Sequence, residues 1–110
     1  MQINIDGHNI ELDNDGYLTN LNDWSEPVAN ALAEQENITL SAAHWEIIEL
    51  LQAFYREFEI SPAMRALVKY TTQKLGEEKG RSIYLLQLFP PSPAKIASKI
   101  AGLPRPTNCL

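Results

Sequence analysis

Residues 41–58 read SAAHWEIIELLQAFYREF, and this stretch decides the fold. Ser41 is a good residue to begin a helix, because its hydroxyl can accept a hydrogen bond from a free backbone N–H of the first turn. Apolar side chains then recur at spacings of three or four residues, the repeat of one helix face: Trp45, Ile48, Leu51, Tyr55 and Phe58. The pattern predicts a central helix that packs the core.

The chain before this helix predicts a β-hairpin. Gln2–Ile5 and His8–Leu12 alternate polar and apolar residues, and Asp6-Gly7 between them is a strong two-residue turn signal. The acidic turn at Asp13–Gly16 resembles a calcium loop only superficially. Counting from Asp13, the position that needs a glutamate is Trp24, so we expect no metal site.

Capping residues, prolines and glycines predict four further helices. The polar stretch 77–80 is expected to be a connection, and the apolar helix after it to be deeply buried and ended by two prolines. The predicted helices are Ser25–Glu36, Ser61–Gly76 with proline at its first position, Ile83–Phe89 and Pro93–Ala101. The expected fold is therefore mainly α, of the α+β kind: an N-terminal β-hairpin, a compact bundle of about five helices and an extended C-terminal arm.

The end of the chain predicts that arm. Gly102 stops the last helix, and Pro104 and Pro106 each fix their own φ and favour extended conformations before them. We expect residues 1–102 to form a single globular domain and residues 103–110 to form a mobile arm. A segment of this kind rises about 3.1 Å per residue, so the arm would carry Cys109 on the order of 20 Å from Leu103.

Length and composition indicate an ordinary soluble domain. The 110 residues are 45% hydrophobic and 21% charged, and the apolar runs are only a few residues long. Gln2-Ile3-Asn4-Ile5-Asp6 after Met1 lacks the features of a signal peptide. A single cysteine excludes an internal disulfide framework and suits a reducing compartment. We expect a cytoplasmic protein with no membrane contact and no cofactor.

Charge is divided unevenly along the chain. Residues 1–64 hold 12 of the 14 acidic residues and one basic residue, a charge of −11, whereas residues 65–110 carry eight basic and two acidic residues, a charge of +6. The basic part also carries the thiol, which makes an anionic partner near the arm plausible. The alternative is that the two halves attract each other within the fold.

The only cysteine, Cys109, is the candidate catalytic residue. Only Leu110 follows it in the sequence, and no apolar periodicity surrounds it. We therefore expect an exposed and reactive thiol rather than a buried one. Lys95, Lys99 and Arg105 favour the thiolate and are candidate partner-binding residues, whereas the terminal carboxylate opposes ionisation. With one thiol, the chemistry must be exchange with an outside sulfur.

Other ionisable residues are interpreted as structural. His44, in the first turn of the central helix, is expected to be partly exposed, and His8 stands alone on a predicted strand. Acid pairs such as Glu46 with Glu49 are typical of a solvated helix face. The sequence contains no glycine-rich phosphate loop.

The chain resembles the DsrC/TusE family of small sulfur-trafficking proteins over nearly its whole length. The most specific element is the cysteine behind Gly102-Leu103-Pro104-Arg105-Pro106. Further matching motifs are Asp15-Gly16-Tyr17-Leu18, Trp24 with Glu26-Pro27, Leu40-Ser41, His44-Trp45-Glu46, Phe54-Tyr55 with Glu57-Phe58, Ser61-Pro62 with Arg65, Gly76–Gly80, Tyr84-Leu85, Leu88–Pro90 and Pro93–Lys95.

The resemblance implies a persulfide carrier. The sulfite-reductase branch of the family has a second cysteine on the last helix, where this chain has Ser98, so the one-cysteine branch is the better match. For that branch the resemblance implies a sulfurtransferase that takes sulfane sulfur on Cys109 from a TusBCD-type complex. It would pass this sulfur to an MnmA-type tRNA 2-thiouridylase, with or without bound tRNA, for thiolation of the wobble uridine.

Two other functions remain open. The helices within Leu40–Gly76 have a helix-turn-helix outline, and the second carries Arg65, Lys69 and Lys74, but the pI near 4.9 and the acidic first helix oppose binding to nucleic acid. The second alternative is a DsrC-like accessory subunit of a sulfite reductase. In that role the thiol would still be essential, but the partner would be the reductase. Ser98 argues against that role.

Overall fold

The structure, a computed structural model, describes residues 1–106. It is mainly helical with a two-stranded antiparallel sheet at the N-terminus, which confirms the predicted fold class. The elements in chain order are β1 (Gln2–Ile5), β2 (His8–Glu11), the 3₁₀ helix η1 (Leu21–Asp23), α1 (Glu26–Gln35), α2 (Ala42–Phe58), α3 (Met64–Leu75), α4 (Glu77–Gly80), α5 (Ser82–Leu88) and α6 (Pro93–Ile100).

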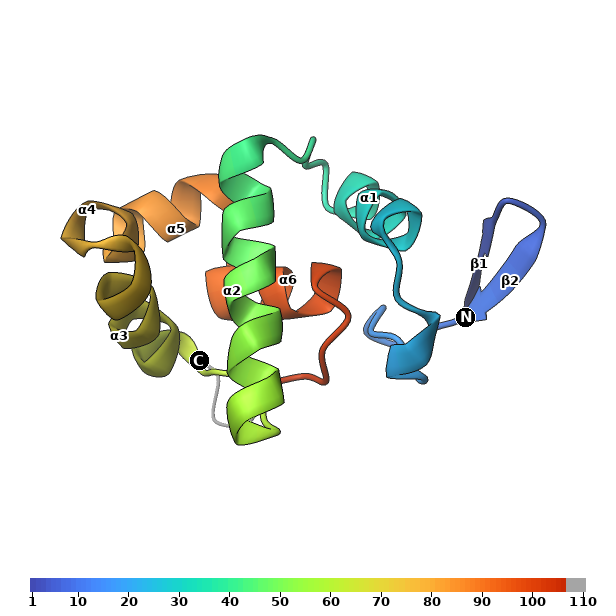
Figure 1. The fold of residues 1–110 in the computed structure, drawn as a ribbon. Helices are drawn as coiled ribbons and strands as arrows, with labels where there is room; N and C mark the ends of the chain where they lie inside the picture. Colours follow the sequence, from blue (N-terminus) through green and yellow to red (C-terminus); the bar gives the residue numbers. More distant parts are fainter. Residues whose placement is uncertain (107–110) are drawn as a thin grey trace.

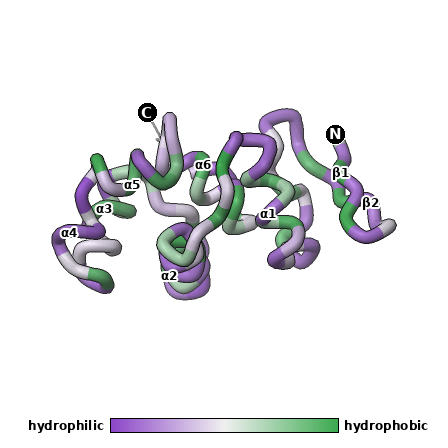
Figure 2. Tube along the Cα trace, turned by 90° about the horizontal axis from the view of Figure 1, so that it is seen from above, coloured by the Kyte–Doolittle hydropathy of each residue, from purple (hydrophilic) through white to green (hydrophobic). Residues whose placement is uncertain are grey.

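Helix α2 stands at the centre, with α6 crossing behind it (Figure 1). Helices α3, α4 and α5 lie on one side of α2, and α1 and the hairpin lie on the other. Figure 2 shows α2 end-on with α6 beside it and the hairpin at the end of the molecule opposite α4. Helix α6 packs against α1, α2, α3 and α5, so it is the element around which the two sides join.

The core lies between α2 and α6. Its apolar side chains come from every long helix, and burying such a side chain stabilises the fold by roughly 1.5–3 kcal/mol relative to leaving it in water. Fully buried members are Leu32 from α1, Ile47, Ile48 and Leu51 from α2, Leu67 from α3, Leu85 from α5, Phe89, and Ala97 and Ile100 from α6.

The predicted apolar face of α2 is partly wrong. Ile48 and Leu51 are buried as expected, but Ile47 and Phe54 complete the buried face, and the side chain of Phe58 is 49% exposed. The reason is length, because the last turn of α2 extends beyond the helices that cover its middle (Figure 1). Phe58 on that turn keeps the helical spacing but lies at the edge of the core, so its ring packs against Phe54 and Tyr70 on one side and faces solvent on the other.

The N-terminal hairpin forms as predicted. Strands β1 and β2 pair with Ile3 opposite Ile10, and Asp6 and Gly7 at the turn have φ of 50° and 85°. Two successive positive φ values are typical of a type I′ turn, whose twist matches that of the strands it joins.

Three other predictions need correction. The third helix begins at Met64 rather than Pro62. Ser61 does not cap it, because the Ser61 hydroxyl donates a hydrogen bond to the Pro104 carbonyl. The expected connection at 77–80 is a helical turn, α4, in which Gly80 lies against the backbone of Thr72, so that an added Cβ would come within 2.8 Å of the Thr72 Cα. Helix α5 is amphipathic rather than deeply buried, because Ile83 is 60% exposed while Leu85 is buried.

Within residues 1–106, no helix combines the length and the hydrophobicity needed to cross a bilayer.

Candidate functional site

The candidate site is the C-terminal segment that leads to Cys109. Helix α6 ends with Gly102 in the left-handed conformation, at φ 80°. The Gly102 N–H donates to the Lys99 carbonyl at 3.1 Å, and the Leu103 N–H donates to the Ser98 carbonyl at 2.9 Å. This pair of bonds is the Schellman motif, which satisfies helix carbonyls and turns the chain sharply away from the helix axis.

Side chains from distant parts of the sequence hold this segment in place. Each donates a hydrogen bond to a backbone carbonyl: one lies within α6, and the other three lie at the end of α6 or in the chain after it, where carbonyls lack a helical partner. The Tyr17 hydroxyl donates to Lys95 at 3.2 Å, Trp24 Nε1 to Ile100 at 2.9 Å, Gln52 Nε2 to Ala101 at 3.0 Å, and Ser61 Oγ to Pro104.

Trp24 also explains why residue 102 is glycine. A Cβ built on Gly102 would lie 2.7 Å from Cγ of the Trp24 ring, far inside ordinary contact distance. Glycine therefore serves twice, by adopting a positive φ and by letting the indole lie against the backbone. The ring and its hydrogen bond to Ile100 together fix the point where the chain leaves α6.

The first part of the predicted arm lies against the globular body. Leu103 is 5% exposed and Pro106 is buried, and Arg105 forms a 2.8 Å ion pair with Asp15. Cys109 lies outside the described residues, so its role and the mobility of residues 103–110 stay predictions. The reach of the arm is therefore shorter if it is counted from Pro106 instead of Leu103. Three residues of extended chain span roughly 10 Å, whereas about 20 Å was expected from Leu103.

The three predicted basic residues line one surface hollow of about 270 Å³, together with Asp15 and Tyr17. Two of them are already in ion pairs. Lys99 Nζ lies 3.2 Å from Glu36 Oε1 and 5.4 Å from the centre of the Tyr17 ring, and Arg105 pairs with Asp15. The structure thus brings Lys95, Lys99 and Arg105 together, but much of their charge is balanced within the protein.

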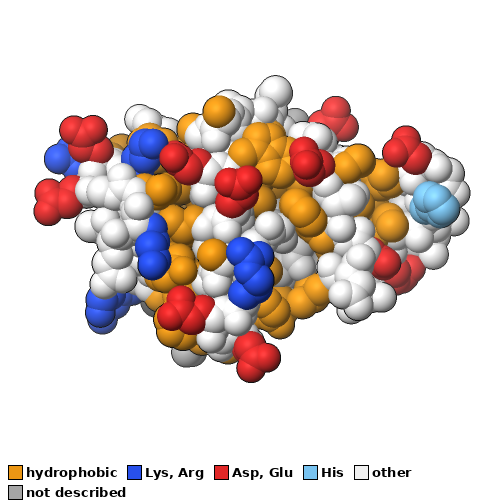
Figure 3. Space-filling model, in the orientation of Figure 1, with side chains coloured by type: hydrophobic (Ala, Val, Ile, Leu, Met, Phe, Trp, Pro, Cys, Tyr) orange, Lys and Arg blue, Asp and Glu red, His pale blue; other side chains and the backbone are white. Residues whose placement is uncertain are grey.

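The charge asymmetry of the sequence is partly resolved inside the fold. Three of the ion pairs found among residues 1–106 join an acid from the first half to a base from the second, and Lys79 with Glu46 is the third of these. The 2.9 Å hydrogen bond to Glu46, and then its negative charge, raise the pKa of Lys79. On the face shown in Figure 3, basic side chains gather over α3, α4 and the lower part of α2.

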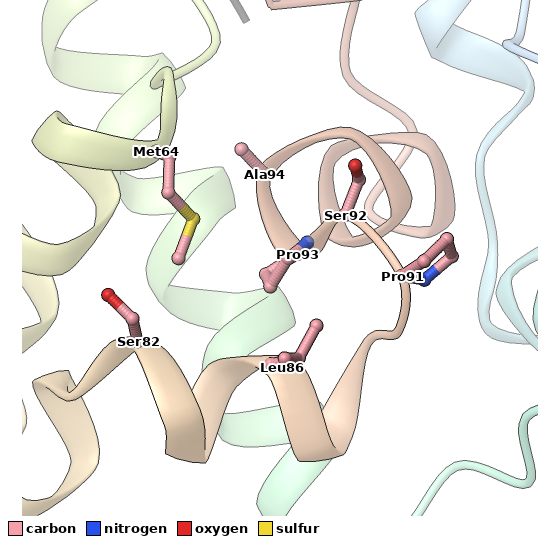
Figure 4. Close-up of a pocket in the computed structure, with 7 residues that line it drawn as sticks. All are labelled: Met64, Ser82, Leu86, Pro91, Ser92, Pro93 and Ala94. Atoms are coloured by element: carbon pink, nitrogen blue, oxygen red, sulfur yellow. The ribbon is translucent and has the colours of Figure 1, made fainter. Parts of the chain in front are cut away.

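An apolar hollow of about 200 Å³ lies between α3, α5 and the start of α6. Figure 4 shows Met64, Ser82 and Leu86 pointing into it around Pro93. Met64 is three residues from Ser61, whose hydroxyl holds Pro104. This hollow could not be predicted from the sequence, because its walls come from separate helices.

Nearly the whole chain matches a known family. The family model described as DsrC like protein matches residues 4–110. This chain belongs to the DsrC-like family.

Members of the DsrC-like family with curated names are close relatives. Sulfurtransferase TusE of Yersinia pestis is 56% identical over 108 residues, 98% of this chain and 99% of the relative. Sulfurtransferase TusE of Escherichia coli K12 is 53% identical over 105 residues, 96% of each chain. At this identity over nearly the full length, the chain is a sulfurtransferase.

Solved structures in the DsrC-like family have the same fold. DsrC of Allochromatium vinosum, determined by NMR, superposes with a TM-score of 0.89 at 50% identity, over 99% of this chain and 97% of that one. The oxidised γ-subunit of dissimilatory sulfite reductase from Archaeoglobus fulgidus gives 0.85 at 36% identity over the whole of both chains.

Two residues singled out from the sequence are buried. His44 is 9% exposed rather than partly exposed: its Nδ1 accepts the Ser41 N–H at 3.0 Å, and its Nε2 lies 2.8 Å from the Leu88 carbonyl, so Nε2 carries the proton. These bonds tie α2 to α5, in keeping with the expected structural role. Ser98, where the sulfite-reductase branch has cysteine, is fully buried, and its hydroxyl has no partner among residues 1–106.

Sequence reasoning missed the residues that hold the C-terminal segment. Tyr17, Trp24 and Ser61 belong to the motifs that carry the family resemblance, which was the one available signal for them. In the sequence Gln52 is a polar interruption beside the apolar face of α2, and in the structure its amide donates a hydrogen bond to the Ala101 carbonyl.

Proposed function

We propose that Cys109 carries sulfane sulfur as a persulfide within a sulfur relay, accepting it from a TusBCD-type complex and passing it to an MnmA-type tRNA 2-thiouridylase. The observation that supports this most directly is the chain's single thiol, three residues beyond a segment that hydrogen bonds anchor to the body. Identity above 50% to sulfurtransferases over nearly the whole chain supports the same chemistry.

The proposed transfer needs no cofactor. The Cys109 thiolate attacks the outer sulfur of a donor persulfide, so that a new S–S bond forms on Cys109, the donor S–S bond breaks, and the donor cysteine leaves as a thiolate. In the second step an acceptor thiolate attacks the outer sulfur on Cys109, and Cys109 leaves as a thiolate. One sulfur moves in each step without net oxidation or reduction of the pair.

The anchored segment would make this transfer efficient. A thiol on a short, proline-containing extension loses less conformational entropy on entering a partner's active site than one on a long flexible chain. Lys95, Lys99 and Arg105 would favour the thiolate and persulfide anions from beside the start of the arm, with Lys99 and Arg105 contributing less because each faces an acid. A reducing cytoplasm would suit the unpaired thiol.

Intact-mass spectrometry tests the proposal. The protein is incubated with a cysteine desulfurase, cysteine and the TusBCD-type complex, and wild type is compared with Cys109→Ser. We expect a gain of about 32 Da, one sulfur, that dithiothreitol removes and that the variant lacks. A second stage adds the thiouridylase and unmodified tRNA, and thiouridine should form only with loaded wild-type protein.

The outcomes separate the candidate functions. Absence of the adduct, with a desulfurase and donor complex that load another acceptor, would contradict the carrier role. A salt-dependent gel shift with duplex DNA that persists in Cys109→Ser would instead favour the helix-turn-helix alternative, because electrostatic binding to phosphate needs no sulfur.

A further inference from the structure

Two large apolar side chains at the end of α2 are exposed over much of their surface, although the ring of Phe58 also packs against Phe54 and Tyr70, with ring centres 4.6 and 6.4 Å away. Phe58 is 49% exposed and Ile60 is 61% exposed, within a run of five exposed residues from 56 to 60. Glu59 between them ends the helix in the left-handed conformation, at φ 57°, which is unfavourable for a residue with a side chain. We call Phe58 and Ile60 together the Phe58–Ile60 patch.

The patch lies at the place where the C-terminal segment is anchored. Ile60 directly precedes Ser61, whose hydroxyl donates to the Pro104 carbonyl. At the lower end of α2, apolar side chains are visible among acidic ones on the surface (Figure 3). Apolar surface of this kind beside a functional segment is typical of a protein-docking site.

The anchor limits where a partner can bind. Cys109 is three residues beyond the buried Pro106 in the sequence, so the covalent chain limits the distance between their Cα atoms to roughly 10 Å. A standard protein interface covers about 800 Å² on each partner, which is a disc of radius about 16 Å. A protein that takes Cys109 into its active site therefore covers the surface where residues 104–106 lie.

The two flanks of this surface differ in chemistry. One flank carries the Arg105–Asp15 ion pair, in which both side chains are more than half exposed, and such a pair suits the wet rim of an interface. The other flank carries the Phe58–Ile60 patch. The centre of an interface is rich in aromatic and other apolar groups, and these carry most of the binding energy.

We propose that the Phe58–Ile60 patch is the docking surface for the relay protein that donates sulfur to Cys109. This inference rests on the proposed carrier function. The donor is favoured over an acceptor loaded with tRNA, because the exposed charges from Arg56 to Arg65 comprise two basic and two acidic side chains and give a phosphate backbone no net attraction. An apolar contact on the donor's surface, beside its persulfide, is the chemistry that fits.

The test measures how the loading of Cys109 depends on donor concentration. Ile60→Ser is the main variant, because its exposed side chain makes the substitution harmless to folding. The matched control is Ile83→Ser, which removes an isoleucine of nearly equal exposure (60%, against 61% for Ile60) from α5, beside the opposite end of α2 (Figure 1). With a TusBCD-type complex charged by a desulfurase, the rate of the 32 Da gain is followed by mass spectrometry.

We expect Ile60→Ser to raise the half-saturating donor concentration about tenfold, as for the loss of a moderate hot-spot residue, and Ile83→Ser to leave it unchanged. The rate at which iodoacetamide alkylates Cys109 should be the same in all three proteins, which shows that the thiol itself is unaltered.

Each contrary result has its own meaning. If wild type gains no sulfur, the carrier function fails. If wild type loads and Ile60→Ser loads with the same concentration dependence, the carrier function stands and the docking surface is wrong. An equal defect in Ile83→Ser, or a defect confined to delivery to the thiouridylase, also overturns the assignment of the patch to the donor.

Discussion

The two ends of the described chain contain glycines in almost the same backbone conformation in opposite surroundings. Gly7, at the hairpin turn, has φ 85° and no atom within 4 Å of an added Cβ, whereas Gly102, after α6, has φ 80° and the Trp24 ring against it. The hairpin is defined by its own residues and lies mostly in water. The C-terminal segment is defined by residues far away in the sequence.

The hydrogen bonds make the same contrast. In the hairpin, the Gly7 N–H donates to the Asn4 side chain, and Asn4 donates to Asn9, so the partners are three and five residues apart. The donors to the C-terminal carbonyls are 43 to 78 residues away from them. A segment held by distant residues is ordered only when the whole domain is folded, and this ties the position of residues 100–104 to the integrity of the core.

The largest expected effect on stability comes from replacing each of these two glycines by alanine. Gly102→Ala should lower the free energy of unfolding by roughly 2–4 kcal/mol, because it combines an unfavourable φ with a clash against the Trp24 ring. Gly7→Ala should cost only about 1 kcal/mol, because only the backbone conformation is affected. Urea denaturation monitored by circular dichroism measures both.

Equal losses for the two variants would contradict this prediction, since they would mean that Trp24 moves aside at no cost. Gly102→Ala should also slow loading of Cys109, whereas Gly7→Ala should leave it at the wild-type rate.

The contrast also explains which features the sequence could predict. The Asp6-Gly7 turn, the start of α1 at Ser25 and the stop at Gly102 are local signals, and each was confirmed. The exposure of Phe58 could not be predicted, because helical spacing does not tell how far the neighbouring helices extend along α2. The predicted start of α3 was wrong because the Ser61 hydroxyl donates a hydrogen bond to the Pro104 carbonyl instead of capping the helix.

For the candidate site, the sequence supplies the hypothesis about the thiol, which stays a prediction, and the structure supplies the surroundings of the basic residues. The lone thiol and the basic residues before it are visible in the sequence, but the pairing of Lys99 with Glu36 and of Arg105 with Asp15 joins residues 63 and 90 positions apart. No periodicity or turn signal connects them. The same limit applies to Gln52. In the sequence it interrupts an apolar helix face, and in the structure it donates a hydrogen bond to the Ala101 carbonyl.

A smaller effect is expected from removing one anchoring hydrogen bond. Trp24→Phe keeps an aromatic ring and leaves the Ile100 carbonyl without its donor, and an unsatisfied buried carbonyl costs about 1–2 kcal/mol. Trp45→Phe on α2 is the control, because its indole N–H has no hydrogen-bond partner in the described part of the chain.

The measurement is the difference in unfolding free energy between the two tryptophan variants, since each also loses ring area. If Trp24→Phe is no more destabilised than Trp45→Phe, the carbonyl finds another partner and the anchor is weaker than the geometry indicates.

The smallest effect on the free energy of unfolding is expected at Ser98. Unlike the preceding substitutions, this one should stabilise the protein. The Ser98 hydroxyl is fully buried without a partner among residues 1–106, so Ser98→Ala should raise the free energy of unfolding by about 0.5–1 kcal/mol by removing the cost of burying an unpaired polar group. Thr71→Val, which removes the other such hydroxyl at nearly constant volume, should act in the same direction. Urea denaturation measures both variants, and a loss of stability in Ser98→Ala would mean that a buried water or another group satisfies the hydroxyl. The stabilised Ser98→Ala protein should load sulfur on Cys109 at the wild-type rate, because a side chain closed off inside the core has no access to the sulfur that the arm carries.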